Sequence, residues 1–155
     1  MTAVAQRFVS GPASPLEGVH SDAWQSFAEV LEVQAVGAIS ASGGLGAFDI
    51  RPRRLVELGY ATNLRRFDGR QFCDFAAPWT QARFLTDPFA QHAVLSKSMQ
   101  AYYDALRRGE IVKPKDMTMS GALAVLHVGG RGALAGWPKL FDNTRALFEA
   151  AQGVF

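Results

Sequence analysis

Residues 87–109, DPFAQHAVLSKSMQAYYDALRRG, carry the clearest structural signal in the chain. Asp87 is a favoured helix N-cap residue, and Pro88 suits the first helical position because an N–H there would have no partner. The two arginines before Gly109 favour the negative end of the helix dipole, and glycine commonly ends a helix. Apolar residues recur between these ends at helical spacing: Phe89, Ala93, Val94, Met99, Tyr102, Tyr103 and Leu106. The stretch therefore predicts a long helix with one apolar face.

A second apolar helix is predicted near the start of the chain, where Ser21 and Asp22 supply a cap and a first-turn acid. Its apolar face follows the spacing of Trp24, Phe27, Ala28, Leu31, Ala35 and Ala38. The glycine-rich residues 42–46 break the pattern, so we expect this helix to run into a loop. Glycine and proline punctuate residues 1–20, which predicts an irregular N-terminal arm, either frayed or ordered only against a partner.

The remaining patterns are short. Helical spacing predicts further helices over residues 52–58, 79–85, 118–128 and 142–151. Asp68-Gly69 is a turn signal in a stretch without a sustained period, so any sheet is at most a small hairpin. The chain is thus predicted to be mainly α, with the arm over residues 1–20 and one helical domain over residues 21–155.

Composition and charge narrow the possible function classes. The chain has 16 basic and 14 acidic residues, a formal charge of +2, and 48% apolar residues, as in an ordinary globular protein. Its Arg-Arg pairs are scattered among acidic or apolar neighbours, so solvated helix faces are a better interpretation than a phosphate-binding patch. No run of about 18 apolar residues is present. The sequence therefore predicts no nucleic-acid partner and no membrane partner.

The number and spacing of the cysteine and histidine residues argue against disulfide bonds and metal sites. The single cysteine, Cys73, cannot form an intrachain disulfide and is interpreted as a small buried hydrophobe. None of the three histidines stands at a ligand-like spacing from a cysteine or an acid, so no metal and no cofactor are predicted. Residues 1–17 show no signal-peptide pattern. We expect a protein made in the cytoplasm that, if it leaves the cell, leaves by lysis or inside a particle.

Two segments carry a resemblance to a known family. The first reads SASGGLGAFDI over residues 40–50 and is followed by Leu58-Gly59-Tyr60, and the second reads MTMSGALA over residues 117–124 and leads into His127-Val128-Gly129-Gly130. Together they resemble the lysozyme-like muramidases and lytic transglycosylases of phages and bacteria. In that family a long helix ends in Glu-Ser-Gly-Gly, and a later Thr-x-Ser-Gly-x-Leu-Ala helix leads into His-Leu-Gly-Gly. The resemblance covers residues 24–134 and implies a lysozyme-like helical fold with a substrate cleft between two lobes.

The resemblance puts Ala41 where the family carries its catalytic glutamate. Cleaving a glycosidic bond needs a carboxylic acid to protonate the leaving oxygen, and positioned acid catalysis is worth about 10²–10⁴-fold. Glu32 falls more than two turns earlier on the predicted helix and cannot reach the same point. Asp49 is the alternative acid, although a loop aspartate more commonly bonds nearby backbone amides. We expect no enzyme activity, with a glycosidase acting through Asp49 as the alternative.

Candidate glycan-binding residues come from the same segments and from the tryptophans. They are Ser42, Gly43, Phe48, Asp49, Trp79 and His127. Tryptophan faces stack well on pyranose rings, but core positions are the more common role for Trp24, Trp79 and Trp137, above all for Trp24 on the apolar face. His127 matches the family's helix histidine and is otherwise a packed core group.

The lost acid, the small size and the arm together suggest a non-catalytic lysozyme-like component of a phage-like particle. A spike, fibre-base or decoration protein fits, such as a head-spike protein of a gene transfer agent. Its expected partners are capsid or fibre proteins, bound through the N-terminal arm, and peptidoglycan or capsular glycan. A carbohydrate-binding module that does not cleave its ligand is compatible with this interpretation.

Overall fold

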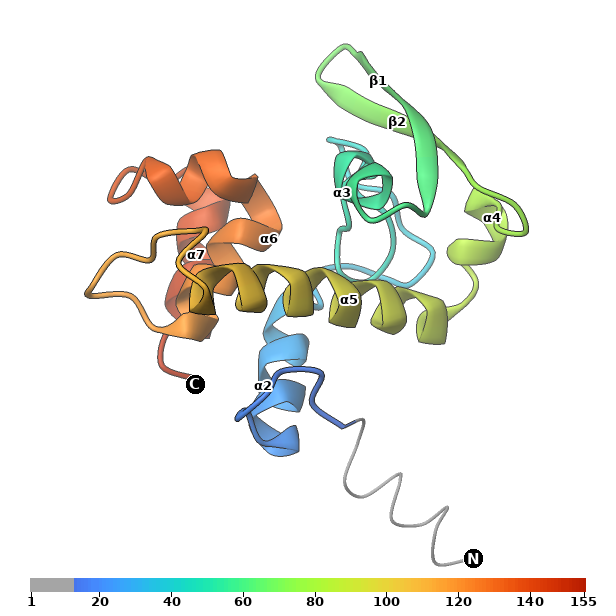
Figure 1. The fold of residues 1–155 in the computed structure, drawn as a ribbon. Coiled ribbons are helices and arrows are strands. Elements are labelled where there is room, and N and C mark those ends of the chain that lie inside the picture. The colour runs from blue at the N-terminus through green and yellow to red at the C-terminus, as the bar shows by residue number, and fades with distance from the viewer. Residues whose placement is uncertain (1–12) are drawn as a thin grey trace, which may run out of the picture. The chain divides into compact units, whose positions relative to one another are not determined.

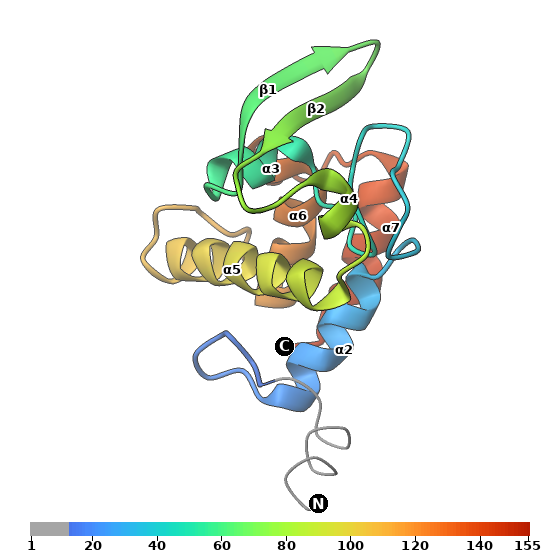
Figure 2. The ribbon, with the colours of Figure 1, turned by 90° about the vertical axis from the view of Figure 1, so that its right-hand side faces the viewer.

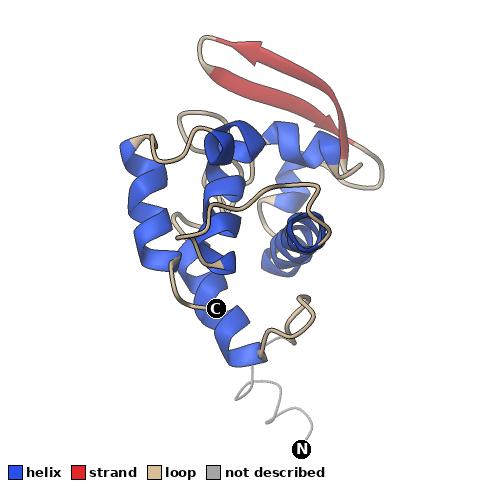
Figure 3. Ribbon diagram, turned by 60° about the vertical axis from the view of Figure 1, so that its left-hand side comes forward, coloured by secondary structure: helices blue, strands red, loops and turns tan. Residues whose placement is uncertain are grey.

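The computed structural model describes residues 13–155, which form helices and one small sheet (Figure 1; Figure 3). In chain order the elements are α2 (Ser21–Leu31), α3 (Pro52–Glu57), β1 (Ala61–Phe67), β2 (Arg70–Phe75), α4 (Gln81–Phe84), α5 (Pro88–Arg107), α6 (Met119–Ala135) and α7 (Asp142–Ala151). Among the described residues, the two strands form one antiparallel sheet. This confirms the predicted class, mainly α with a small hairpin.

Contacts divide the chain into two compact units. Unit 1 comprises the described residues up to Leu31 together with Met99–Phe155, and unit 2 comprises Glu32–Ser98. Helix α5 therefore contributes its first part to unit 2 and its second part to unit 1. The sequence predicts a different division, into an arm over residues 1–20 and one helical domain over residues 21–155.

The predicted N-terminal arm falls partly on residues 1–12, which lie outside the described residues. The described remainder is irregular and is attached to α5 within unit 1. Leu16 is buried, the Tyr103 hydroxyl donates to the Glu17 carbonyl at 2.8 Å, and Arg107 pairs with the Glu17 carboxylate at 3.0 Å. Contacts with α5 therefore fix the described part of the arm, residues 13–20, within unit 1.

Unit 1 is built around α6, whose residues 120–126 are all buried. A helix that is apolar all round needs cover on every side, and α7 supplies part of it (Figure 1). Gly121 allows this approach because a Cβ there would lie 2.1 Å from Oε1 of Gln152. Helix α2 adds Trp24 and Phe27, and the Phe27 ring meets the C-terminal Phe155 edge-on at 5.3 Å.

The start of α6 agrees with the sequence prediction, but its end does not. Thr118 caps it, since its side chain accepts a hydrogen bond from the Gly121 N–H. The predicted stop at Gly129-Gly130 appears as a kink, because Gly130 has φ 69° and the chain then resumes helical turns to Ala135. A glycine adopts this left-handed backbone at no steric cost, so the helix changes direction there.

Unit 2 carries the hairpin, with α3 packed beside it (Figure 2). Asp68 and Gly69 both have positive φ and form the predicted turn. Strand pairing runs from Phe67 opposite Arg70 to Ala61 opposite Phe75, with an irregularity between Thr62 and Arg65. The sequence of β1 does not show the alternation of apolar and polar residues that marks a half-buried strand, because β1 is exposed after Ala61.

The first predicted helix is shorter than its apolar spacing suggests. Helix α2 ends at Leu31, so Ala35 and Ala38 are not helical. The backbone N–H groups of Val33 and Gln34 both donate to the Ala47 carbonyl, at 2.9 and 3.3 Å. Contacts with the glycine-rich loop thus replace the next helical turn, which is a tertiary effect that local spacing does not encode.

Helix α5 confirms the strongest sequence prediction, with one correction. The Asp87 carboxylate caps the Ala90 N–H at 3.1 Å, and Gly109 follows the helix with φ 76°. Phe89, however, is 85% exposed, while the neighbouring Gln91 is buried. Gln91 takes the interior position because its amide bonds three backbone groups, which offsets the cost of burying a polar side chain.

Candidate binding site

The glycine-rich loop of unit 2 forms a tight turn at Ser40–Gly44. The Ser40 N–H donates to the Gly44 carbonyl at 2.8 Å, and the Gly44 N–H donates to the Ser40 hydroxyl at 2.9 Å. Gly43 has φ 93°, and a Cβ there would lie 2.3 Å from the Gln71 carbonyl oxygen. Only glycine fits at this point, so the turn and the hairpin pack backbone to backbone.

Ala41 lies exposed within this turn. The sequence resemblance expects this position at the end of a long helix, but α2 ends well before it, at Leu31. The residue that directly follows α2 is Glu32, which is exposed. The turn therefore presents a methyl group to solvent at the position that matches the family's acid.

Asp49 is the sole acid of residues 39–50 and is half-buried. Its backbone N–H donates to the Gly46 carbonyl at 3.1 Å and its φ is 51°, an uncommon value for a residue with a side chain. Oδ2 pairs with Nη2 of Arg51 at 3.3 Å, and the side chain is 21% exposed. Asp49 thus holds the loop in the way expected of a turn residue.

The other carboxylate oxygen of Asp49 is packed against the backbone. A Cβ on Gly44 would lie 1.6 Å from Oδ1 of Asp49 and 2.9 Å from the Ser40 hydroxyl, so all three groups crowd one point. Oδ1 is buried and has no hydrogen-bond partner among residues 13–155. Buried oxygens without a partner are uncommon in folded proteins, which makes this carboxylate the most unusual polar group of the loop.

Ser42 is engaged in structure. Its hydroxyl lies 3.2 Å from that of Ser40, and its carbonyl accepts from the Gln71 N–H at 3.0 Å. The Gln71 side chain in turn accepts from the Arg53 N–H at 3.1 Å, at the start of α3. Gln71 therefore joins the loop, the hairpin and α3, a role that sequence reasoning missed because nothing in an aperiodic stretch marks it.

Phe48 belongs to the interior of unit 2. It is 1% exposed, and its ring meets the His92 imidazole edge-on with centroids 4.8 Å apart. In this position Phe48 offers no free face for stacking on a sugar. Its contribution to a site is to fix the loop on α5.

Trp79 lines a small apolar cavity of unit 2. The cavity measures about 60 Å³, and its other aromatic walls are Tyr60, Phe75 and Phe84. The Arg83 guanidinium covers the Trp79 ring at 4.5 Å from its centroid. Ligand pockets usually measure about 300–1,000 Å³, so a pyranose would enter only after these rings move.

His127 belongs to unit 1, where it lies half-buried on α6 shortly before the kink at Gly130. The candidate residues Ser42, Gly43, Phe48 and Asp49 share one loop of unit 2, and Trp79 lies elsewhere in the same unit. The loop residues are thus brought together, whereas Trp79 and His127 each have separate surroundings.

Another acid of the hairpin, Asp74, lies exposed on β2. Arg65 donates to both its oxygens at 3.1 Å, and Asn63 donates at 3.0 Å. These hydrogen bonds hold the pKa of the Asp74 carboxyl below its ordinary value. A carboxyl that stays ionised to a lower pH than usual is a poor proton donor near neutral pH.

Cys73, next to Asp74, is half-buried. Burial raises the pKa of its thiol, and the Asp74 charge raises it further. Residues 13–155 contain no cluster of three histidine, cysteine or acidic side chains able to hold a metal ion. Within the same residues, no helix has the length and apolar character needed to cross a membrane.

Comparison with known proteins gives no further assignment. No protein-family model, no curated protein and no solved structure matches this chain significantly.

Proposed function

We propose that this chain is a non-catalytic, lysozyme-like binding component of a phage-like particle. One observation carries the proposal: the loop that resembles the family's catalytic segment has a methyl group at Ala41, and the sole acid of residues 39–50, Asp49, is bound by Arg51 and packed on Gly44. The segments over residues 24–134 that resemble the family supply the lysozyme-like part of the proposal.

The chemistry of the loop supports the loss of catalysis. Glycosidic cleavage requires a proton donor directed at the leaving oxygen, and the Ala41 side chain has no proton to give. The Ser42 hydroxyl pairs with another hydroxyl, that of Ser40, so no general base activates it as a nucleophile. What the loop retains is a rigid turn, which suits binding or structural support.

Exposed aromatic rings support the assembly part of the proposal. Phe67 at the end of β1, Phe89 at the start of α5 and Phe141 before α7 are 77%, 85% and 85% exposed. Aromatic side chains of this kind are enriched where proteins contact one another. In a particle they would contact capsid or fibre proteins, and peptidoglycan or capsular glycan would be the external ligand.

The first experiment measures muropeptide release from purified peptidoglycan by the natural chain, Ala41→Glu and Asp49→Asn. We expect no release by the natural chain or by Asp49→Asn. Release of muropeptides by Ala41→Glu would support a lysozyme-like ancestor, because this substitution restores a glutamate at the position where the resemblance puts the family's catalytic acid. Cosedimentation with intact peptidoglycan in the same experiment reports glycan binding without cleavage.

The second experiment tests the particle. Particles released by lysis of the producing bacterium are separated on a density gradient, and an antibody against this chain locates it. We expect the chain in the particle fractions. Its confinement to soluble protein in the lysate would contradict the particle assignment and leave the lysozyme-like resemblance untouched.

The alternative function is a working glycosidase that uses Asp49. It is favoured by the buried Oδ1, which has no partner among residues 13–155, and by the positive φ of the residue. Under this alternative the natural chain digests peptidoglycan and Asp49→Asn abolishes digestion while leaving the circular dichroism spectrum unchanged. Digestion by both proteins would point to an acid elsewhere in the chain.

A further inference from the structure

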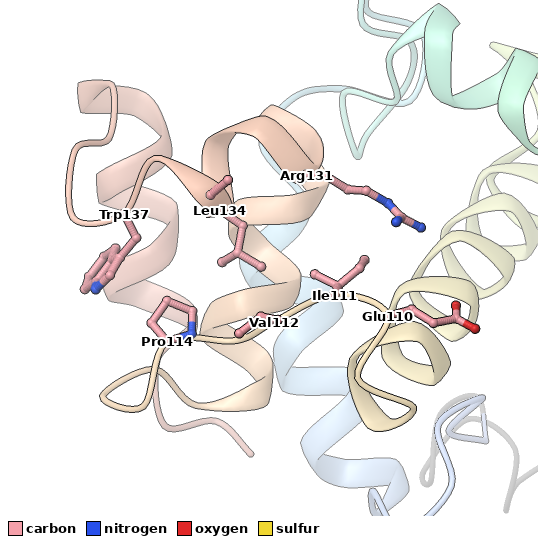
Figure 4. Close-up of a pocket in the computed structure, with 8 residues that line it drawn as sticks. Glu110, Ile111, Val112, Pro114, Arg131, Leu134 and Trp137 are labelled. Atoms are coloured by element: carbon pink, nitrogen blue, oxygen red, sulfur yellow. The ribbon is translucent and has the colours of Figure 1, made fainter.

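A groove lies on unit 1, apart from the loop described above. It measures about 430 Å³ and is formed by the segment after α5 and the part of α6 beyond its kink (Figure 4). Its lining residues are Glu110, Ile111, Val112, Pro114, Arg131, Leu134, Ala135 and Trp137. The volume falls within the range of pockets that hold a ligand or an anchoring side chain.

One end of the groove is apolar. Trp137 is half-buried and packs against the Phe148 ring with centroids 4.9 Å apart, while Leu134 is buried beneath. Val112 is 82% exposed, although it is a large β-branched residue. An apolar side chain from a ligand would remove the exposed surfaces of Val112 and Trp137 from water, which is favourable by about 25 cal/mol per Å².

The other end carries the positive charge of Arg131. It lies near Glu110, whose pKa is lowered mainly by Arg108 and further by the Arg131 charge. Figure 4 shows Arg131 and Glu110 at this end, opposite Trp137. Both oxygens of Glu110 accept from Arg108, at 2.9 and 3.1 Å, so this acid already has a cationic partner. The Arg131 guanidinium forms no ion pair or hydrogen bond with the rest of residues 13–155. It remains available for a bidentate contact with a carboxylate.

The wall between the two ends offers main-chain partners. The segment over residues 111–114 has no regular structure, and neither backbone group of Val112 is hydrogen-bonded within the described residues. An extended peptide can bond to such a free segment while placing its side chains in the groove. A sugar ring would satisfy these groups less fully along the apolar wall.

We propose that this groove binds an extended peptide segment of a partner protein in which an acidic residue stands close to a large apolar residue. The acid binds Arg131, and the apolar side chain lies over Leu134 against Trp137. This inference deepens the proposed function by giving the chemistry of the partner segment. Only the identification of the partner as a particle protein rests on the proposed function.

The test measures binding of fluorescent peptides to the full chain. The probes are acetylated, amidated peptides that carry Leu-Phe and one glutamate, separated by one, two or three alanines, and a matched set has glutamine in place of glutamate. We expect at least one glutamate peptide to bind at concentrations up to about 1 mM, and its glutamine counterpart to bind about tenfold more weakly.

Variants locate the binding. Arg131→Gln is expected to weaken the glutamate peptide about tenfold and to leave the glutamine peptide unchanged. Val112→Ala is expected to weaken both, and the Trp137 indole N–H resonance is expected to shift on binding. Arg66→Gln is the matched control, since Arg66 is another exposed arginine without an ion pair among the described residues, on the hairpin of unit 2.

The proposal is overturned if no probe binds, if glutamate and glutamine peptides bind equally, or if Arg131→Gln binds as the natural chain does. Loss of peptidoglycan cosedimentation in Arg131→Gln, with no peptide bound, would make the groove a glycan site instead. Peptide binding by a chain absent from particles would sustain this inference and overturn the proposed function, so the two failures are distinguishable.

Discussion

The side-chain oxygen of Gln91 accepts the backbone N–H of Ala47 at 2.8 Å, in the interior of unit 2. The same amide donates to the carbonyls of Val36 and Phe84, at 2.8 and 3.0 Å. One side chain on α5 therefore satisfies backbone groups from two irregular segments and from the end of α4. Gly46 makes room for it, since a Cβ there would lie 2.4 Å from the Gln91 amide.

Replacing Gln91 should therefore destabilise the protein strongly. Gln91→Leu removes the partners of the Ala47 N–H and the Val36 carbonyl and one of the two partners of the Phe84 carbonyl, and we expect a loss of about 3 kcal/mol in the free energy of unfolding. Urea denaturation followed by circular dichroism measures the change. The exposed Gln100 on the same helix provides the control, and Gln100→Leu should change stability by no more than about 0.5 kcal/mol.

The contact between Gly44 and Asp49 predicts a rescue. Gly44→Ala places a methyl group on the Asp49 carboxylate, and we expect a loss of about 2 kcal/mol or more. Asp49→Gly removes the carboxylate and suits the positive φ, so the double variant should regain part of the loss. Gly132→Ala is the control, because nothing lies within 4 Å of its Cβ position. Additive losses in the double variant would contradict the contact.

Ser120 is expected to fix the C-terminus of unit 1. Its buried hydroxyl lies 2.7 Å from the Ala151 carbonyl and 2.9 Å from the Phe155 carbonyl, and it accepts from the Phe155 N–H at 3.1 Å. Ser120→Ala should cost about 1–3 kcal/mol and speed amide exchange at the C-terminus. Ser26→Ala, at an exposed position on α2, should leave both unchanged.

The hairpin should respond to acid through Asp74. Because hydrogen bonds from Arg65 lower the folded-state pKa of this carboxyl, its stabilising contribution is fully present above the ordinary carboxyl pKa. The contribution is lost as the pH falls through the lowered pKa. Arg65→Gln should raise the Asp74 pKa in an NMR titration and should reduce thermal stability near neutral pH. The difference between the two proteins should vanish in strong acid.

The Cys73 thiol should react slowly at neutral pH. Burial and the neighbouring Asp74 charge raise its pKa, and the thiolate is the reactive form. Its rate with a chromogenic aromatic disulfide should keep rising beyond the pH at which an ordinary thiol levels off. Asp74→Asn should shift the profile to lower pH, and an unshifted profile would show that the Asp74 charge does not act on the thiol.

Local signals in the sequence determined the helix ends that depend on single residues. The cap at Asp87, the proline at position 88 and the glycine at 109 bound α5, and α7 spans the predicted residues 142–151. These predictions succeeded because capping and glycine conformations involve only neighbours along the chain. The glycine-rich loop was likewise evident, since Gly43 and Gly44 are required by the turn itself.

Tertiary structure decided burial and helix length at the positions where local spacing gave the wrong prediction. Helix α2 ends at Leu31 because the Ala47 carbonyl captures the next N–H groups, and Gln91 is buried in place of Phe89 because it bonds distant backbone. The groove at Arg131 joins segments far apart in sequence. The spacing of apolar residues along the chain reports the periodicity of a single helix or strand. Hydrogen bonds and contacts between elements depend on where the fold places those elements.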